Sequence, residues 1–233
     1  METDPEGRAF FDALFEASED ECLARFQPRF AHYTHPGVGW NCLMVAASRF
    51  SLTLVKRLIE AGTDVNYVSI KNRGETALLF AAERWQSLSL ETVELLLSYG
   101  ANPMYACKYG RNCLMEALDA ARTAFTHQQR HNIEPNEHDC SVRKFEVLVR
   151  AGADLLHRDM HGESVLKMLR RVLPEKYCPL FRTWWTRAAN CQIAVRCLER
   201  ICRVHRPGMA SRDVLGLVVK ALWKTRCEEE WEF

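Results

Sequence analysis

Residues 39–47 read Gly-Trp-Asn-Cys-Leu-Met-Val-Ala-Ala, and the same pattern returns twice further along the chain. The second copy is Gly-Glu-Thr-Ala-Leu-Leu-Phe-Ala-Ala at residues 74–82, and the third is Gly-Arg-Asn-Cys-Leu-Met-Glu-Ala-Leu at residues 110–118. A partial fourth copy, Gly-Glu-Ser-Val-Leu, begins at residue 162. A pattern that recurs at this interval predicts a stack of similar structural units.

Each full copy is followed by an apolar stretch and a glycine. The three glycines are Gly62, Gly100 and Gly152. Leucine and valine at helical spacing predict a second helix with one apolar face, and glycine suits the left-handed backbone at which such a helix ends. The third residue of each copy is expected to cap the first helix by accepting a hydrogen bond from a backbone N–H. These residues are Asn41, Thr76, Asn112 and Ser164.

This combination resembles the ankyrin repeat, which reads Gly-x-Thr-Pro-Leu-His-x-Ala-Ala, then a helix, then Leu-Leu-x-x-Gly-Ala-Asp-x-Asn. The resemblance implies an all-α ankyrin-repeat solenoid of helix-turn-helix units with β-hairpin tips, followed by a C-terminal helical cap. The chain departs from the pattern at the expected proline and histidine. Cys42, Ala77, Cys113 and Val165 replace the proline, and Met44, Leu79, Met115 and Lys167 replace the histidine. The hydrogen bonds that histidine makes between turns are then missing, which predicts a less rigid stack.

The repeat spacing predicts the organisation of the chain. We expect an N-terminal capping repeat at 1–38, repeats at 39–73, 74–109 and 110–161, a partial repeat at 162–173 and a C-terminal helical region at 174–233. The interval from the first glycine to the second is 23 residues in the first repeat and 42 in the third. About nineteen residues are therefore inserted in the third repeat, and their polar composition predicts a loop at about 123–140. The second repeat has about three extra residues near 87–89.

The bulk composition is that of an ordinary globular protein. The chain has 233 residues, 48% of them hydrophobic, and a formal net charge of +1. So small a charge makes nucleic acid an unfavoured partner. We find no signal peptide and no apolar run of the roughly 18 residues that span a bilayer. The expected location is therefore intracellular, cytoplasmic or nuclear, without membrane contact, and the ten cysteines are expected to be free thiols.

Two clusters were considered as metal sites. One comprises His127, His131, His138 and Cys140, and the other comprises Cys191, Cys197, Cys202 and His205. His127 and His131 are four residues apart and could share a metal on one helical face. Neither cluster has the spacing of a known zinc motif, so solvated histidines and buried thiols are the preferred interpretation. Phosphate-binding glycine loops and hydrolase motifs are also absent from the sequence, which predicts a non-catalytic chain without cofactor or metal.

The ankyrin resemblance implies that partners bind a concave face made of the hairpin tips and the inner helices. Carried over to this chain, the expected partner-binding residues are Tyr67, Lys71, Arg73, Tyr105, Lys108, Tyr109, Arg111, His157 and Arg158. Tyrosine and arginine are enriched at protein interfaces and at their energetic centres. The preferred function is therefore a protein-protein interaction module.

The C-terminal region supports an alternative function. Ser211 is suited to cap a helix that runs from Asp213 to about Arg226. Residues 211–231 are similar to the first helix of F-box-like boxes, which link ankyrin proteins to cullin-type ubiquitin ligases. The alternative is thus a substrate adaptor that recruits a ubiquitin-ligase subunit through Asp213–Trp231. A final helix packed on the body explains the same residues.

Overall fold

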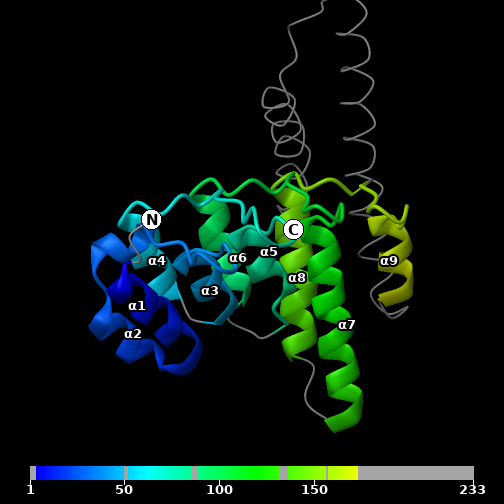
Figure 1. Cartoon of the computed structure of the whole chain (residues 1–233). Coiled ribbons are helices and arrows are strands. Elements are labelled where there is room, and N and C mark those ends of the chain that lie inside the picture. The colour runs from blue at the N-terminus through cyan, green and yellow to red at the C-terminus, as the bar shows by residue number, and fades with distance from the viewer. Residues whose placement is uncertain (1–3, 50–51, 86–88, 132–135, 156, 173–233) are drawn as a thin grey trace, which may run out of the picture.

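The computed structural model describes residues 4–49, 52–85, 89–131, 136–155 and 157–172, and within these ranges the fold is helical (Figure 1). An inner row contains α1 (Pro5–Glu16), α3 (Cys42–Arg49), α5 (Ala77–Glu83), α7 (Cys113–His131) and α9 (Val165–Val172). An outer row contains α2 (Glu19–Arg25), α4 (Leu52–Glu60), α6 (Ser89–Ser98) and α8 (Asn136–Arg150). A short 3-10 helix, η1 (Pro28–His32), follows α2. Each helix contacts the next in its own row, which confirms the predicted all-α repeat fold.

The first helix of each unit begins at the predicted cap. The capping oxygens accept from the backbone N–H three residues later, at 2.9 Å for Asn41, 3.4 Å for Thr76, 3.1 Å for Asn112 and 3.2 Å for Ser164. Each of these bonds satisfies a donor that the helix itself cannot. Three of the caps, Asn41, Asn112 and Ser164, also form isolated β-bridges, to Thr34, Ala106 and Arg158, and no strand forms in the described ranges. The β-hairpin tips are therefore hairpin-shaped loops.

The second helices end as the glycines predict. Gly62 has a φ of 95°, and its N–H donates to the Ile59 carbonyl at 2.9 Å while the Thr63 N–H donates to the Leu58 carbonyl at 3.2 Å. The same pair of bonds recurs at Gly100 and Gly152. This is a Schellman turn, which satisfies the last carbonyls of a helix and returns the chain toward the next tip.

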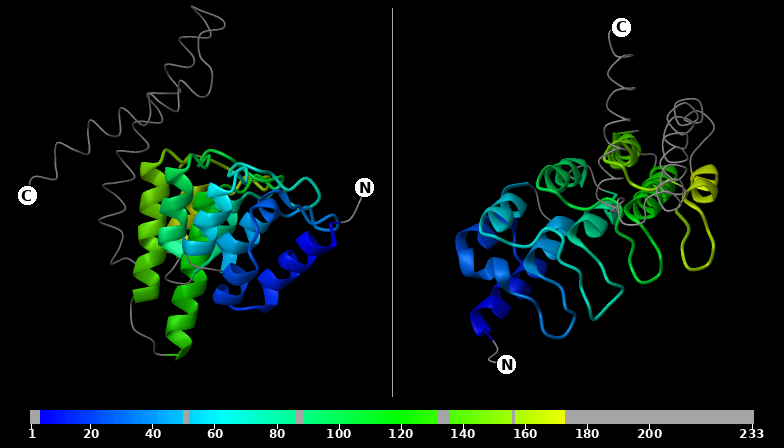
Figure 2. Two further views of the ribbon diagram at one scale, coloured as in Figure 1. Left: turned by 90° about the vertical axis from the view of Figure 1, so that its left-hand side faces the viewer. Right: turned by 90° about the horizontal axis from the view of Figure 1, so that it is seen from above.

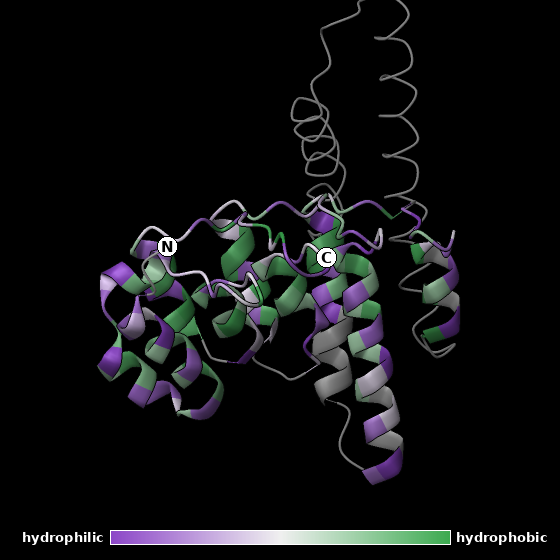
Figure 3. Cartoon of the chain, viewed as in Figure 1, coloured by the Kyte–Doolittle hydropathy of each residue, from purple (hydrophilic) through white to green (hydrophobic). Residues whose placement is uncertain are grey.

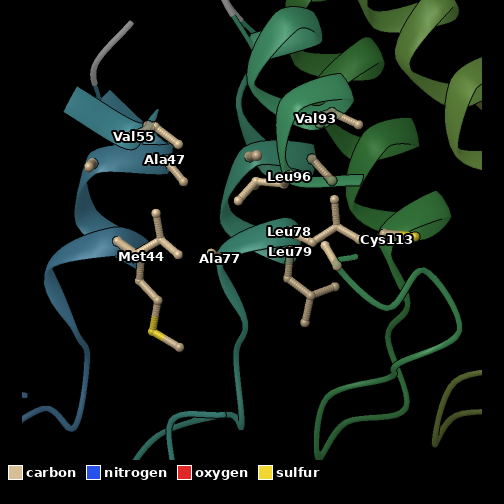
Figure 4. Close-up of a cluster of buried hydrophobic side chains, with 14 of the residues drawn as sticks. Met44, Ala47, Val55, Ala77, Leu78, Leu79, Val93, Leu96 and Cys113 are labelled. Carbon is tan, nitrogen blue, oxygen red and sulfur yellow. The ribbon is translucent and has the colours of Figure 1, made fainter. Parts of the chain in front are cut away.

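Small and apolar residues fill the space between inner helices. Ala46, Ala47, Ala81, Ala82 and Ala117 are completely buried, and the leucines of the recurring pattern, Leu43, Leu78 and Leu114, are at most 2% exposed. Figure 4 shows Ala47 and Leu78 in this core. Burying one leucine stabilises the fold by about 1.5–3 kcal/mol. The hydrophobic colouring in Figure 3 concentrates on these helices.

Apolar packing also replaces the missing histidines. Met44, Leu79 and Met115 are all buried at that position. Side chains of neighbouring units therefore meet there by contact instead of by hydrogen bonds.

A helix pair forms at the N-terminal end, as the sequence predicts. Asp4 caps α1 by accepting from the Gly7 N–H at 2.9 Å. The Ser18 and Glu21 side chains form a capping box at the start of α2. Phe10 is buried and stacks on Phe30 at a centroid distance of 4.9 Å, so the pair is held to η1 and contacts α3.

The predicted loop at 123–140 is wrong. Residues up to His131 continue α7, and α8 already begins at Asn136, so the inserted residues lengthen both helices. Ala120, Ala121 and Ala124 favour helix intrinsically and are buried, which offsets the polar residues that suggested a loop. In Figure 1 the two helices project beyond their neighbours as an arm.

The cysteines inside the described ranges are unpaired and buried where their side chains are defined, which agrees with the expected free thiols: Cys22, Cys42, Cys107 and Cys113. Burial raises the pKa of Cys42 and of Cys113 to about 12. As for membrane contact, none of the described helices has both the length and the apolar character needed to cross a bilayer.

We predict that Cys42 and Cys113 resist alkylation in the native protein. Their raised pKa leaves a thiolate fraction on the order of one in ten thousand at about pH 8. Alkylation is slow because the thiolate is the reactive form. Mass spectrometry after iodoacetamide treatment should find both residues unmodified in buffer and fully modified in denaturant. Labelling of either residue at the same rate in both conditions would contradict the burial of these thiols.

We predict that Gly110→Ala destabilises the stack more than Gly162→Ala. Both glycines have left-handed backbones, with φ of 72° and 74°, and alanine there costs about 1–2 kcal/mol. A Cβ at Gly110 would also lie 2.9 Å from the Met160 nitrogen and 3.0 Å from the Asp159 Cα, whereas no described atom lies within 4 Å of one at Gly162. Urea denaturation measures the difference, and equal losses would show that neighbouring tips are not in close contact.

Candidate partner-binding surface

The hairpin tips lie side by side along one edge of the stack (Figure 2). Each tip is closed by a backbone bond between equivalent residues, for example Ser69 N–H to the Glu75 carbonyl at 2.9 Å. Neighbouring tips are also joined directly. The Lys108 N–H donates to the Arg73 carbonyl at 2.7 Å, and the Met160 N–H donates to the Tyr109 carbonyl at 2.9 Å. The tips therefore form one connected edge.

Three predicted site residues hold this edge together, and we call them the tip ladder: Tyr67, Tyr105 and His157. Each one reaches the carbonyl of the glycine in the preceding tip. The Tyr67 hydroxyl donates to Gly39 at 3.1 Å, the Tyr105 hydroxyl donates to Gly74 at 2.8 Å, and His157 Nε2 lies 2.5 Å from the Gly110 carbonyl oxygen. All three side chains are half-buried. Their polar atoms are used in hydrogen bonds between neighbouring tips. That these residues contact a partner remains a prediction from the sequence.

Two other predicted residues, Arg73 and Arg111, line a cleft of about 450 Å³ beneath the tips, which we call the arginine cleft. The remaining lining residues are Glu83, Trp85, Glu116, Asp119, Ala120, Arg122 and Thr123. They come from the end of α5 and from the face of α7 toward it. The cleft is thus built where the second and third units meet.

Ion pairs fix both arginines of the cleft. Arg73 Nε donates to Glu75 at 2.9 Å, and its Nη2 donates to Glu83 at 3.4 Å. Arg111 Nε donates to Glu116 at 2.8 Å, and its Nη2 also binds Asp119. Charged pairs of this kind are directional and hold a guanidinium in one orientation.

The carboxylates of the cleft differ in their electrostatic surroundings. Burial raises the pKa of Glu83, and the negative charge of Glu116 raises it further, against the opposing effect of Arg73. Burial disfavours the charged form of Arg111, but its hydrogen bond to Glu116 and the charges of Glu116 and Asp119 outweigh burial and raise its pKa. Arg111 therefore stays protonated and anchors the carboxylates around it.

The remaining predicted residues lie exposed on the tips, and we call this surface the crest. Lys71, Lys108, Tyr109 and Arg158 belong to it. The ammonium groups of Lys71 and Lys108 bind carbonyl oxygens of the preceding tip, and Arg158 Nη1 donates to the Gly162 carbonyl at 3.0 Å. Ile70 and Met160 are exposed beside them. The predicted site is therefore divided between ladder, cleft and crest.

The acidic half of the cleft was missed from the sequence. Glu116 is only 6% exposed, although the equivalent positions of the other copies hold Val45 and Phe80. The sequence did contain a signal for this residue, a carboxylate at a repeat position that is otherwise apolar. Such a carboxylate indicates a buried ion pair, since a buried charge requires a partner.

Helix α7 lines one side of the cleft, and α8 packs against α7. Lys144 of α8 is fully buried, and its ammonium group donates to the Ala82 carbonyl at 3.2 Å and to the Arg84 carbonyl at the end of α5. A cation here also complements the negative end of the helix dipole. The His127 ring of α7 packs on Trp85 at a centroid distance of 4.9 Å. The inserted residues thus attach the third unit to the second.

The structure describes some of the residues in the two candidate metal clusters. The rings of His127 and His131 lie 4.6 Å apart between centroids on α7. His138 and Cys140 belong to α8, but their side chains are not among those described, and Cys191, Cys197, Cys202 and His205 lie outside the described residues. Within the described ranges no three histidine, cysteine or carboxylate side chains are grouped to hold a metal ion.

Comparison with known families and proteins agrees with this geometry. A family model of ankyrin repeats in three copies matches residues 16–106 and 43–128. An ankyrin repeat protein of Acanthamoeba polyphaga mimivirus is 43% identical over 76 residues, which cover 30% of this chain and 12% of the viral protein. A second protein of that kind from the same virus is 35% identical over 68 residues, which cover 29% of this chain and 42% of the relative.

A mammalian protein shows a similar match. Ankyrin repeat, SAM and basic leucine zipper domain-containing protein 1 of Notamacropus eugenii is 36% identical over 87 residues, which cover 36% of this chain and 17% of that protein. The chain thus spans less than half the length of each of these relatives. The family model matches residues in which caps, Schellman turns and tips repeat. Residues 16–128 of the chain therefore contain ankyrin repeats.

Proposed function

We propose that this chain is a non-catalytic module that holds a partner protein against the crest and the arginine cleft. Ankyrin repeats are protein-protein interaction modules, and the family is generally non-catalytic. The observation that carries the proposal is the connected edge of tips, because it presents Tyr109 and three exposed cations on a scaffold that is fixed by hydrogen bonds. A surface that is ordered before binding loses less entropy on association.

The arginine cleft supports the same proposal. Arg73 and Arg111 are already oriented by carboxylates, so their remaining N–H donors and the half-exposed Glu83 can hydrogen-bond to a partner without rearrangement. Arginine, tyrosine and tryptophan are the residues most often found at the energetic centre of an interface, and Trp85 lines the same cleft.

The adaptor function is a second proposal. It rests on residues 211–231, which lie outside the described residues, and on their similarity to an F-box-like helix. In this proposal the repeats hold a substrate while Asp213–Trp231 recruits a ubiquitin-ligase subunit. The first proposal does not depend on this region.

We predict that Tyr109→Ala removes partner binding and leaves stability unchanged. Tyr105→Phe should lower stability and leave partner binding unchanged. Tyr109 is exposed on the crest, but the Tyr105 hydroxyl donates to the Gly74 carbonyl, a bond worth about 1 kcal/mol. Affinity capture from lysate, quantified by mass spectrometry, reads out binding, and urea denaturation reads out stability.

Tyr99→Ala is the matched control, because Tyr99 is similarly exposed but follows the outer helix α6. Proteins captured by the wild type and the Tyr99 variant but lost from the Tyr109 variant would be specific partners. Identical capture by all three proteins would contradict a binding role for the crest.

We predict for the adaptor that truncation after Arg206 removes association with cullin-ligase subunits while proteins bound through the crest are retained. Co-precipitation with the truncated and the intact chain measures this. If the truncated chain loses its helical circular dichroism, the region is a cap, and if ligase subunits never associate with the intact chain, the adaptor function is excluded.

A further inference from the structure

We infer that the crest recognises an acidic segment of a partner that also carries large apolar side chains. The inference rests on the proposed function and specifies the partner's chemistry. It comes from the side chains that each tip displays outward.

Each of three tips exposes at least one large apolar side chain. Ile70 is 77% exposed, Tyr109 is 48% exposed and Met160 is 61% exposed. They occupy the turns of consecutive units, so they form a row along the edge. Isolated exposed apolar residues need no explanation, but a row with one member per repeat is a contact surface.

Each of the same tips also presents a cation. Lys71 is next to Ile70, Lys108 is next to Tyr109, and Arg158 is on the tip of Met160. None of these three cations is ion-paired with a carboxylate in the described part of the chain. Their nitrogens bind backbone carbonyls, which positions the charge without neutralising it.

Acidic side chains are nearly absent from these tips. Over residues 70–74, 108–110 and 158–162 the sequence contains one carboxylate, Asp159. Its Oδ1 accepts from the backbone N–H groups of His161 and Glu163 at 2.9 and 2.8 Å, so it is committed to its own tip. The crest is therefore a positively charged strip with apolar residues between the charges.

The geometry of the strip is fixed, which favours an extended ligand. The Lys108 N–H to Arg73 carbonyl bond and the Met160 N–H to Tyr109 carbonyl bond hold the three tips in register. An extended peptide can place carboxylates and apolar side chains at matching intervals along such a row.

The chemistry favours a peptide over a nucleic acid. Three cations neutralise few phosphates, so a nucleic acid would bind weakly. In this row Tyr109 alone has an aromatic ring on which a base could stack, and Ile70 and Met160 offer bases neither a ring nor a hydrogen bond. Leucine, isoleucine or phenylalanine side chains of a peptide would pack against Ile70 and Met160.

The test selects ligands from a phage-displayed random dodecapeptide library on the full chain. Selected peptides are expected to be enriched in aspartate or glutamate together with large apolar residues. Binding of a synthetic selected peptide, measured by fluorescence anisotropy, should weaken at least about tenfold in the variant Lys71→Glu, Lys108→Glu, Arg158→Glu, because three ion pairs are lost and reversed. Binding should also weaken as salt is raised.

The matched control is the variant Arg25→Glu, Arg57→Glu, Arg130→Glu, which makes the same change in net charge at exposed residues on helices. Its affinity should stay within about twofold of the wild type, because its charges lie away from the crest. Circular dichroism and urea denaturation verify that both variants are folded.

Selection of peptides without acidic residues, or equal weakening in both variants, would overturn the inference. So would binding of a uridine dodecamer, measured in parallel, if it were lost only in the crest variant while no acidic peptide bound. Protein partners lost with Tyr109→Ala would in each of these cases still support the proposed function, so the two failures are distinguishable.

Discussion

Close approach of the inner helices is the constraint on which the rest of this structure depends. Alanines on α3, α5 and α7 are completely buried where these helices face one another, and larger side chains there would hold the helices apart. Only at this separation do the tips come near enough for the Tyr67 and Tyr105 hydroxyls to reach the preceding glycine carbonyls. The helix packing therefore sets the spacing of the crest, and function on the edge depends on small residues in the interior.

Local signals in the sequence predicted the elements well because each has a local physical cause. A capping side chain such as Asn41 acts within one turn, and a glycine such as Gly62 meets a need of its own backbone. The loop predicted at 123–140 was wrong because its cause is not local. Those residues are helical because buried alanines and the contact of His127 with Trp85 stabilise them, and no window of sequence shows that contact.

The candidate site likewise has features that could be predicted from the sequence and features that could not. Tyr105 and Tyr109 are four residues apart and of the same type, yet the Tyr105 hydroxyl is bonded to the neighbouring tip and the Tyr109 ring is exposed. Position within a tip decides the role, and the repeat pattern does not reveal it. Likewise the arginines of the cleft were predicted, but the carboxylates that orient them were not, because Glu116 and Asp119 come within reach of Arg111 only when α7 is formed.

Lys144 has a consequence for how the stack opens. Its buried ammonium group belongs to the third unit but terminates the inner helix of the second, since it holds the carbonyls of Ala82 and Arg84. If α8 detached while α5 stayed folded, those carbonyls would lose their donor and the end of α5 would fray. The second and third units therefore open as one cooperative block, and the cleft that lies between them exists only while both are closed.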